Sequence, residues 1–123
     1  KGKLSAPVKA SIHARFGTDS NGVSRQGLTF EANSGESVLA VHSGRVVFAD
    51  WLRGAGLLVI VDHGDSYMTL YGNNESLEVM AGVSIVAGEV VANAGRGAGE
   101  NAGLHFEIRK GGIALNPEAW LSK

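Results

Sequence analysis

The unbroken apolar run Leu57-Leu58-Val59-Ile60-Val61 decides the fold. Consecutive aliphatic side chains followed by the turn-forming residues 62–66 are typical of a strand that is buried on both faces at the centre of a sheet. We therefore predict that small antiparallel sheets assemble around residues 57–61.

Length and composition favour a single all-β domain. The chain has 123 residues, is 44% hydrophobic and contains 18 glycines but only 2 prolines. Many short runs of Val, Leu and Ile separated by glycine indicate short strands and tight turns, and this length supports one core of its own. We predict one domain over residues 1–123. Because the chain starts at Lys1 without an initiator methionine, we expect it to be the excised C-terminal domain of a longer protein.

Charge and cysteine content exclude several classes of protein. Eleven basic and 12 acidic residues nearly cancel, so no global field attracts nucleic acid. The absence of cysteine excludes a disulfide framework and a thiolate metal site. No apolar run approaches the ~18 residues of a transmembrane helix. Composition alone leaves the cellular compartment open.

Turn clusters divide the rest of the chain into short segments. Strands are predicted at residues 11–17, 37–41, 45–51, 57–61, 67–72, 89–95 and 103–108. Loops are predicted at residues 18–24, 73–76 and 96–103. The closing residues 116–121 are expected to form a turn with one helical turn, in which Trp120 plugs the end of the core.

The stretch Gly103-Leu104-His105-Phe106-Glu107 is the best candidate for chemistry. Alternate side chains of a strand share a face, so His105 and Glu107 lie on one side while Leu104 and Phe106 lie on the other. If the apolar side faces a core, we expect His105 to face a cleft.

Motifs in a fixed order resemble those of the LytM-type (lysostaphin-like) zinc metallopeptidases of bacterial cell walls. They are Phe16-Gly17, Gly27-Leu28, residues 35–46, Gly56-Leu57, residues 59–64, Tyr71-Gly72, Gly82 with Gly88, residues 104–109 and Asn116-Pro117. The set covers nearly the whole chain. The resemblance implies a lysostaphin-like fold of small antiparallel sheets with an active-site groove.

The resemblance also implies that the zinc site has been lost. Active members hold zinc with His-x-x-x-Asp and the second histidine of His-x-His, leaving an open position for water. The corresponding ligand positions here are Arg25, Thr29 and His105, and the assisting histidines correspond to Asn73 and Gly103. Only His105 keeps the family residue. One imidazole beside a permanent cation cannot hold catalytic zinc, so we expect neither peptidase activity nor a metal or other cofactor.

Among degenerate members, the resemblance is greatest to the EnvC-type murein hydrolase activators, with the NlpD type next. The residues that carry it are 49–52, 62–64, 70–73, 106–109 and 116–121. It implies a Gram-negative periplasmic domain that activates zinc-dependent N-acetylmuramoyl-L-alanine amidases at the division septum. Docking to an FtsEX-type membrane complex would involve upstream regions.

A vestigial groove is the predicted partner-binding surface. Its predicted contacts are Arg25, Gln26, Leu28, Leu58, Tyr71, Asn73, His105 and Arg109. Arginine can form forked bonds to a carboxylate, and aromatic residues often anchor interfaces. The alternatives are ordinary: a surface ion pair for Arg25, an inert remnant for His105 and a solvated strand end for Arg109. Leu28, Leu58 and Tyr71 are core residues if they do not flank the groove.

The predicted function is non-enzymatic. Binding of a regulatory segment of a cell-wall amidase in the groove would favour the open amidase by a population shift. Two other hypotheses belong to different classes. A passive peptidoglycan-binding module would bind cell walls directly, and a residual zinc endopeptidase would cleave wall peptides by itself.

Overall fold

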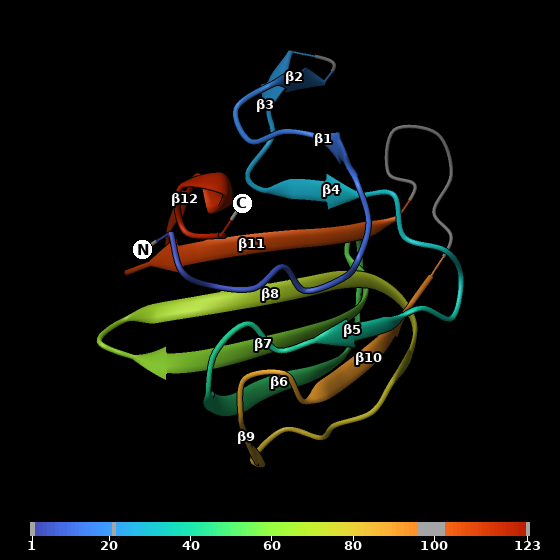
Figure 1. The fold of residues 1–123 in the computed structure, drawn as a ribbon, viewed down its shortest axis with the longest axis vertical. Helices are drawn as coiled ribbons and strands as arrows, with labels where there is room; N and C mark the ends of the chain where they lie inside the picture. Colours follow the sequence, from blue (N-terminus) through green and yellow to red (C-terminus); the bar gives the residue numbers. More distant parts are fainter. Residues whose placement is uncertain (1, 21, 96–102, 123) are drawn as a thin grey trace.

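An antiparallel sheet dominates the computed structural model, which describes residues 2–20, 22–95 and 103–122 (Figure 1). The strand order is β1 (Ile12–Ala14), β4 (Leu28–Phe30), β11 (Leu104–Lys110), β8 (Tyr67–Leu77), β7 (Gly56–Gly64), β6 (Gly44–Leu52) and β9 (Ser84–Ile85). Every neighbouring pair along this path is antiparallel. The all-β prediction is confirmed.

Smaller elements pair with the ends of this sheet. They are β5 (Ser37–Leu39), which pairs with β10 (Val90–Ala94), β12 (Ile113–Leu115), which pairs with β11, and a separate hairpin of β2 (Asp19–Ser20) and β3 (Val23–Ser24). The hairpin occupies residues 18–24, so the prediction of a plain loop there is wrong. The predicted helical turn is confirmed as a 3₁₀ helix, Pro117–Ala119, whose Glu118 N–H donates to the Asn116 side chain.

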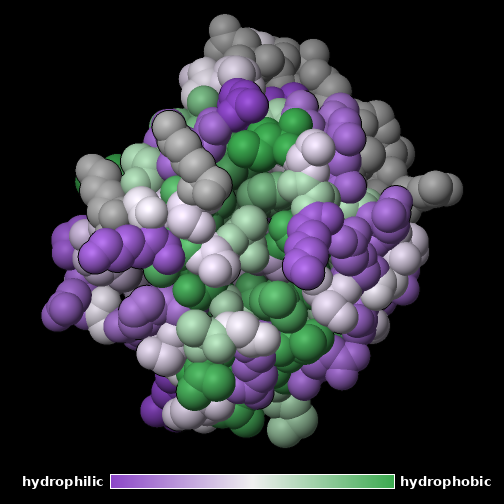
Figure 2. All heavy atoms as spheres, viewed as in Figure 1, coloured by the Kyte–Doolittle hydropathy of each residue, from purple (hydrophilic) through white to green (hydrophobic). Residues whose placement is uncertain are grey.

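The core lies between the main sheet and the β5–β10 pair. Val59 and Val61 of β7 are fully buried there, together with Val38 of β5 and Val91 of β10. In Figure 1, β5, β10 and the N-terminal segment cross in front of the main sheet. From the same side, Figure 2 shows apolar residues gathered at the centre and polar residues around them. One face of the sheet is therefore covered by these segments.

The run at residues 57–61 is an interior strand, as predicted, but the prediction that it is buried on both faces is wrong, because Leu57 and Ile60 are only half-buried. β7 pairs with β6 on one side and with β8 on the other. Its alternate residues Val59 and Val61 face the core, whereas Ile60 is half-buried. This difference arises because successive side chains point to opposite faces, and only one face lies under β5 and β10.

β8 is longer than predicted because it continues through a bend. Residues 73–76 were predicted as a loop, but Asn73 adopts a φ of +64° and the strand runs on to Leu77. Asparagine tolerates this left-handed conformation better than most residues. The Asn73 N–H donates to Ala55 O at 2.7 Å, and the Gly95 N–H donates to Asn73 O at 3.0 Å. Before the bend β8 pairs with β7 and β11, and after it with β10.

Trp120 closes one end of the core, as predicted. Its half-buried side chain packs against the core, with its ring centroid 5.2 Å from that of Tyr67. The Leu4 N–H donates to Trp120 O, and the Ser122 N–H donates to Leu4 O. These bonds hold the first and last described segments side by side.

Gly103 leads the chain into β11 through a conformation that requires glycine. Its φ is +99°, and a Cβ atom built there would overlap the carbonyl oxygen of Phe30. A histidine could therefore not occupy this position without a shift of the backbone. The preceding residues 96–102, predicted as a glycine-rich loop, lie outside the described residues. Within the described ranges, no helix is long and apolar enough to span a membrane.

Replacing Gly103 by alanine should destabilise the fold strongly. A left-handed alanine costs about 1–2 kcal/mol, and displacing a packed neighbour adds about 1–3 kcal/mol. Gly111 is the matched control, because its φ is +58° but a Cβ atom there meets nothing within 4 Å. Urea unfolding should show a loss of about 3 kcal/mol for Gly103→Ala and about 1 kcal/mol for Gly111→Ala. Equal losses would contradict the close approach to Phe30.

Candidate functional site

The second face of the sheet carries His105. In the strand register, His105 of β11 lies opposite Thr29 of β4 on one side and Gly72 of β8 on the other. Directly opposed residues project to the same face. The missing side chain at Gly72 leaves room beside the imidazole, and the His105 side chain is 38% exposed. His105 thus faces away from the core, but it lines none of the three pockets described in the structure, so the cleft expected around it stays a prediction.

Glu107 is the centre of a polar network on this face. Its carboxylate accepts a hydrogen bond from His105 Nε2 at 2.7 Å and another from Arg109 Nε at 2.7 Å. Arg109 Nη1 also donates to Gly112 O at 3.0 Å. One buried carboxylate thus holds two basic side chains in a row along β11.

Opposing effects act on the pKa of Glu107. Burial raises it, because desolvation disfavours the charged form. The hydrogen bonds from His105 and Arg109, and the charges of these groups, lower it and outweigh burial, so that the pKa lies below its ordinary value. Glu107 is therefore an anion at neutral pH although it is only 8% exposed.

The Arg109 end of this face is hollowed. A cavity of about 470 Å³ lies between the β7–β8 turn and the β11–β12 turn. Its lining residues are Asp62, Gly64, Asp65, Ser66, Met68, Arg109, Gly111 and Gly112. Arg109 lies opposite Met68, whose side chain is partly exposed. The His105–Glu107–Arg109 row therefore leads into a hollow with both charged and apolar walls.

Apolar side chains form the rest of the face. Leu70 lies opposite Glu107 and also opposite Ile60, so all three share this side of the sheet, where both aliphatic residues are half-buried. Leu58 belongs to the same side, because its Cδ1 lies 3.6 Å from a Cβ atom built on Gly72. The predicted contact Leu58 is only 3% exposed, however, so it supports the floor of the face from below.

The predicted contacts Leu28 and Tyr71 are wrong. Both lie opposite Phe106, which faces the core, and both are fully buried. The Tyr71 and Phe106 ring centroids are 5.4 Å apart. Strand alternation accounts for the error, because Tyr71 precedes Gly72 and must point to the opposite face.

The remaining predicted residues lie at the margins of the face. Arg25 is half-buried and Gln26 is exposed, and both come immediately before β4. The Arg25 N–H donates to Thr18 O, which fixes the backbone at that point. Asn73 lies at the other margin, where its Nδ2 donates to Gly103 O at 2.7 Å. A hydrogen bond thus joins the two positions that the resemblance assigns to assisting histidines.

The donor set around His105 does not fit zinc. Zinc sites use deprotonated Cys, neutral His or carboxylate ligands in a tetrahedral arrangement. His105 lies opposite Thr29 in the strand register, so the neighbouring strand offers a threonine and not a carboxylate or a second histidine. Within residues 2–20, 22–95 and 103–122, no group of three or more His, Cys, Asp or Glu side chains is placed to hold a metal ion.

Two residues important to this face were missed by sequence reasoning. Glu107 was expected to share the face with His105, but its bonding to both neighbours was not foreseen. Gly27 is the second, because a Cβ atom there would lie 2.7 Å from Glu107 Cγ and closer still to Phe106 O. The chain before β4 therefore packs directly on the stem of the buried Glu107 side chain. The contacts of Glu107 with His105 and Arg109 could have been predicted from their two-residue spacing, which places all three on one face of the strand.

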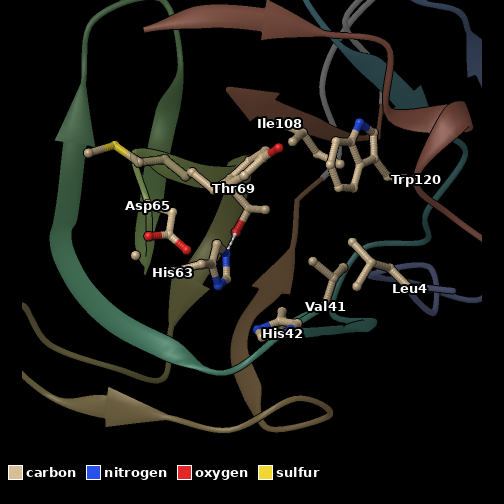
Figure 3. A pocket seen from close by; sticks show the side chains of 11 residues that line it. Leu4, Val41, His42, His63, Asp65, Thr69, Ile108 and Trp120 are labelled. Carbon is tan, nitrogen blue, oxygen red and sulfur yellow. Dashed lines mark hydrogen bonds between the residues drawn. The ribbon is translucent and has the colours of Figure 1, made fainter. Parts of the chain in front are cut away.

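A separate pocket lies on the covered face of the sheet (Figure 3). Its volume is about 290 Å³. The lining residues are Leu4, Val41, His42, His63, Gly64, Asp65, Tyr67, Met68, Thr69, Ile108 and Trp120. Ile108 and Thr69 oppose each other in register and point away from the Glu107 side. The pocket thus opens on the core side of the sheet, and it shares Gly64, Asp65 and Met68 with the hollow beside Arg109.

His63 anchors a hydrogen-bonded chain beneath this pocket. His63 Nδ1 lies 2.8 Å from Ser43 O, and Nε2 lies 2.7 Å from Thr69 Oγ1 (Figure 3). Thr69 Oγ1 lies 2.8 Å from Tyr71 Oη, which accepts a bond from the Val41 N–H at 3.2 Å. The chain joins the segment before β6 to the sheet.

Burial favours a neutral His63. A carbonyl only accepts, so Nδ1 donates to Ser43 O. Thr69 Oγ1 donates to Tyr71 Oη, which also accepts from the Val41 N–H. Desolvation by burial lowers the pKa of His63 further than the Ser43 bond raises it, with His42 lowering it as well.

Stability should fall on acidification because of His63. Its folded-state pKa lies below the ordinary histidine value of 6.5, so the unfolded chain binds the extra proton first. Stability is then full above pH ~6.5 and declines as the pH falls from there towards the folded pKa. Thermal unfolding between pH 7.5 and 5.0 should show a steeper loss for the wild type than for His63→Gln, which can keep both contacts without titrating. Parallel pH profiles would contradict this role of His63.

The fold defines a lysostaphin-like protein. Lysostaphin from Staphylococcus simulans superposes with a TM-score of 0.86 at 23% identity, covering 98% of this chain and 54% of that one. The model for Peptidase family M23 matches residues 23–117. The chain belongs to peptidase family M23, and the predicted LytM-type resemblance is confirmed.

Curated relatives narrow the comparison. Murein hydrolase activator EnvC of Escherichia coli (strain K12) is 40% identical, with 100% of this chain and 30% of that protein covered. Murein hydrolase activator NlpD of the same strain is 33% identical, with 94% of this chain and 30% of that protein covered. The predicted resemblance to the EnvC and NlpD types is confirmed. The chain spans about a third of the length of these relatives.

Proposed function

We propose that this chain is a non-catalytic activator of zinc-dependent N-acetylmuramoyl-L-alanine amidases. It would act on peptidoglycan splitting in the periplasm, at the division septum. The open face around Glu107 would bind a regulatory segment of the amidase. We name this face the groove face and define it by His105, Glu107, Arg109, Leu70 and Met68.

One observation supports this proposal above the others. His105, which the resemblance assigns as a zinc ligand, lies opposite Thr29, and within the described residues no three His, Cys, Asp or Glu side chains are grouped to hold a metal ion. A peptidase needs a metal with an open coordination position, whereas a binding surface needs fixed donors beside apolar area. The groove face offers the second arrangement, and the relatives EnvC and NlpD are named as activators rather than hydrolases.

The mechanism is a shift of the amidase population. A regulatory segment can either block the amidase's own zinc site or bind elsewhere. If the groove face binds the segment only when it has left that site, each bound complex removes a molecule from the blocked population. The size of the activation is set by the difference in affinity of the groove face for the two amidase states.

Dye release from labelled peptidoglycan tests the proposal. The purified domain should release no dye alone and should increase release when a cognate amidase is present. Met68→Lys should reduce activation about tenfold, because it places a charge among the apolar contacts of the interface. Its unfolding temperature should stay within a few degrees of the wild type, because the side chain is already 36% exposed.

Met80→Lys is the matched control. Met80 is 71% exposed in the connection between β8 and β9, away from the groove face. The Met80→Lys variant should activate the amidase as strongly as the wild type does. No rise in release with both proteins folded would refute the activator function. Retention of the domain on cell walls without any effect on the amidase would favour a peptidoglycan-binding module instead.

A further inference from the structure

Glu107 occupies an unusual place for an ionised side chain. It is 8% exposed, lies in the middle of β11 and accepts from a basic side chain at each oxygen. Buried carboxylates of this kind are costly unless hydrogen bonds satisfy them. Within the described residues, the side-chain hydrogen bonds of Glu107 are made with His105 and Arg109, the two basic side chains of the groove face.

We propose that Glu107 is the positioning residue of the groove face, which fixes the orientation of the His105 ring and of the Arg109 guanidinium toward the partner. This inference rests on the proposed function. The carboxylate would act through its two neighbours, without touching the partner. The partner group that meets Arg109 is then an acceptor, a carboxylate or a main-chain carbonyl that enters the hollow beside Met68.

Geometry explains why a carboxylate is needed. Glu107 Oε2 holds His105 Nε2 and Oε1 holds Arg109 Nε, each at 2.7 Å, so neither ring nor guanidinium can rotate freely. Gly112 O binds Arg109 Nη1 at 3.0 Å and fixes the guanidinium plane further. Side chains held before binding lose less conformational entropy when the partner arrives. Among the described residues, no hydrogen bond engages the second terminal nitrogen of Arg109, which remains a donor.

Packing supplies a second constraint on the carboxylate. Gly27 approaches Glu107 so closely that a Cβ atom there would lie 2.7 Å from Glu107 Cγ. The chain before β4 therefore packs against the Glu107 side chain and restricts its movement. Because Gly27 lies against Glu107, the segment that contains Arg25 and Gln26 is held beside the same carboxylate.

A glutamine at this position separates charge from shape. In Glu107→Gln, the amide oxygen can accept from Arg109 Nε while the amide nitrogen donates to His105 Nε2. His105 must then carry its proton on Nδ1 instead of Nε2. The side chains keep their volume, but the donors of the groove face are redistributed and the anion between them is lost.

The amidase titration tests this inference. With the full domain, the concentration that gives half-maximal activation should rise about tenfold for Glu107→Gln, because a charge-assisted bond that orders the contact residues is lost. Nitrogen-15 chemical shifts of His105 should show the proton moving from Nε2 to Nδ1. Glu31→Gln is the matched control, because Glu31 pairs with His13 at 3.6 Å on the exposed surface. It should leave activation unchanged.

Arg109→Lys provides a second variant should Glu107→Gln fail to fold. Lysine keeps the positive charge but lacks the planar fork that Glu107 and Gly112 hold, so activation should weaken by a similar factor. Activation equal to wild type in a folded Glu107→Gln or Arg109→Lys would overturn the positioning role. An unchanged His105 proton position in Glu107→Gln would overturn it as well. Failure of the wild type to activate at all would refute the proposed function instead.

Discussion

The alternation of side chains along β11 is the constraint on which the rest of the structure depends. Leu104, Phe106 and Ile108 are buried in the core, while His105, Glu107 and Arg109 form the polar row of the opposite face. A shift of register by one residue would place a carboxylate and a guanidinium in the core, at a cost of several kcal/mol. The packing of the core therefore fixes the geometry of the groove face.

Hydrogen bonds within the chain take up the positions where the family resemblance places metal chemistry. Glu107 binds His105, and Asn73 binds the Gly103 carbonyl through a left-handed residue that also bends β8. Gly103 itself has a backbone conformation that excludes a larger side chain. Placing zinc-ligating side chains at positions 25 and 29 alone would therefore leave the Glu107–His105 bond, the Asn73–Gly103 bond and the Gly103 backbone conformation in place.

The sequence predicted the strands better than the contacts of their side chains. The apolar run at residues 57–61 and the alternation at residues 103–108 identified β7 and β11, because burial on a pleated surface depends on local pattern. The extension of β8 was not predictable, since the left-handed Asn73 is stabilised by Ala55 and Gly95 from distant segments. Tyr71 was predicted as a contact because it lies in the family motif Tyr71-Gly72, but as the residue before Gly72 it points to the opposite face of the strand.

Backbone amide shifts of the nitrogen-15-labelled domain, recorded while the amidase is added, test the central claim most directly. The account predicts that the largest changes occur at His105, Glu107, Arg109 and their cross-strand partners Met68 and Gly72, with little change around Trp120. Changes concentrated around the His63 pocket, or none at saturating amidase, would contradict the assignment of the groove face as the partner-binding surface.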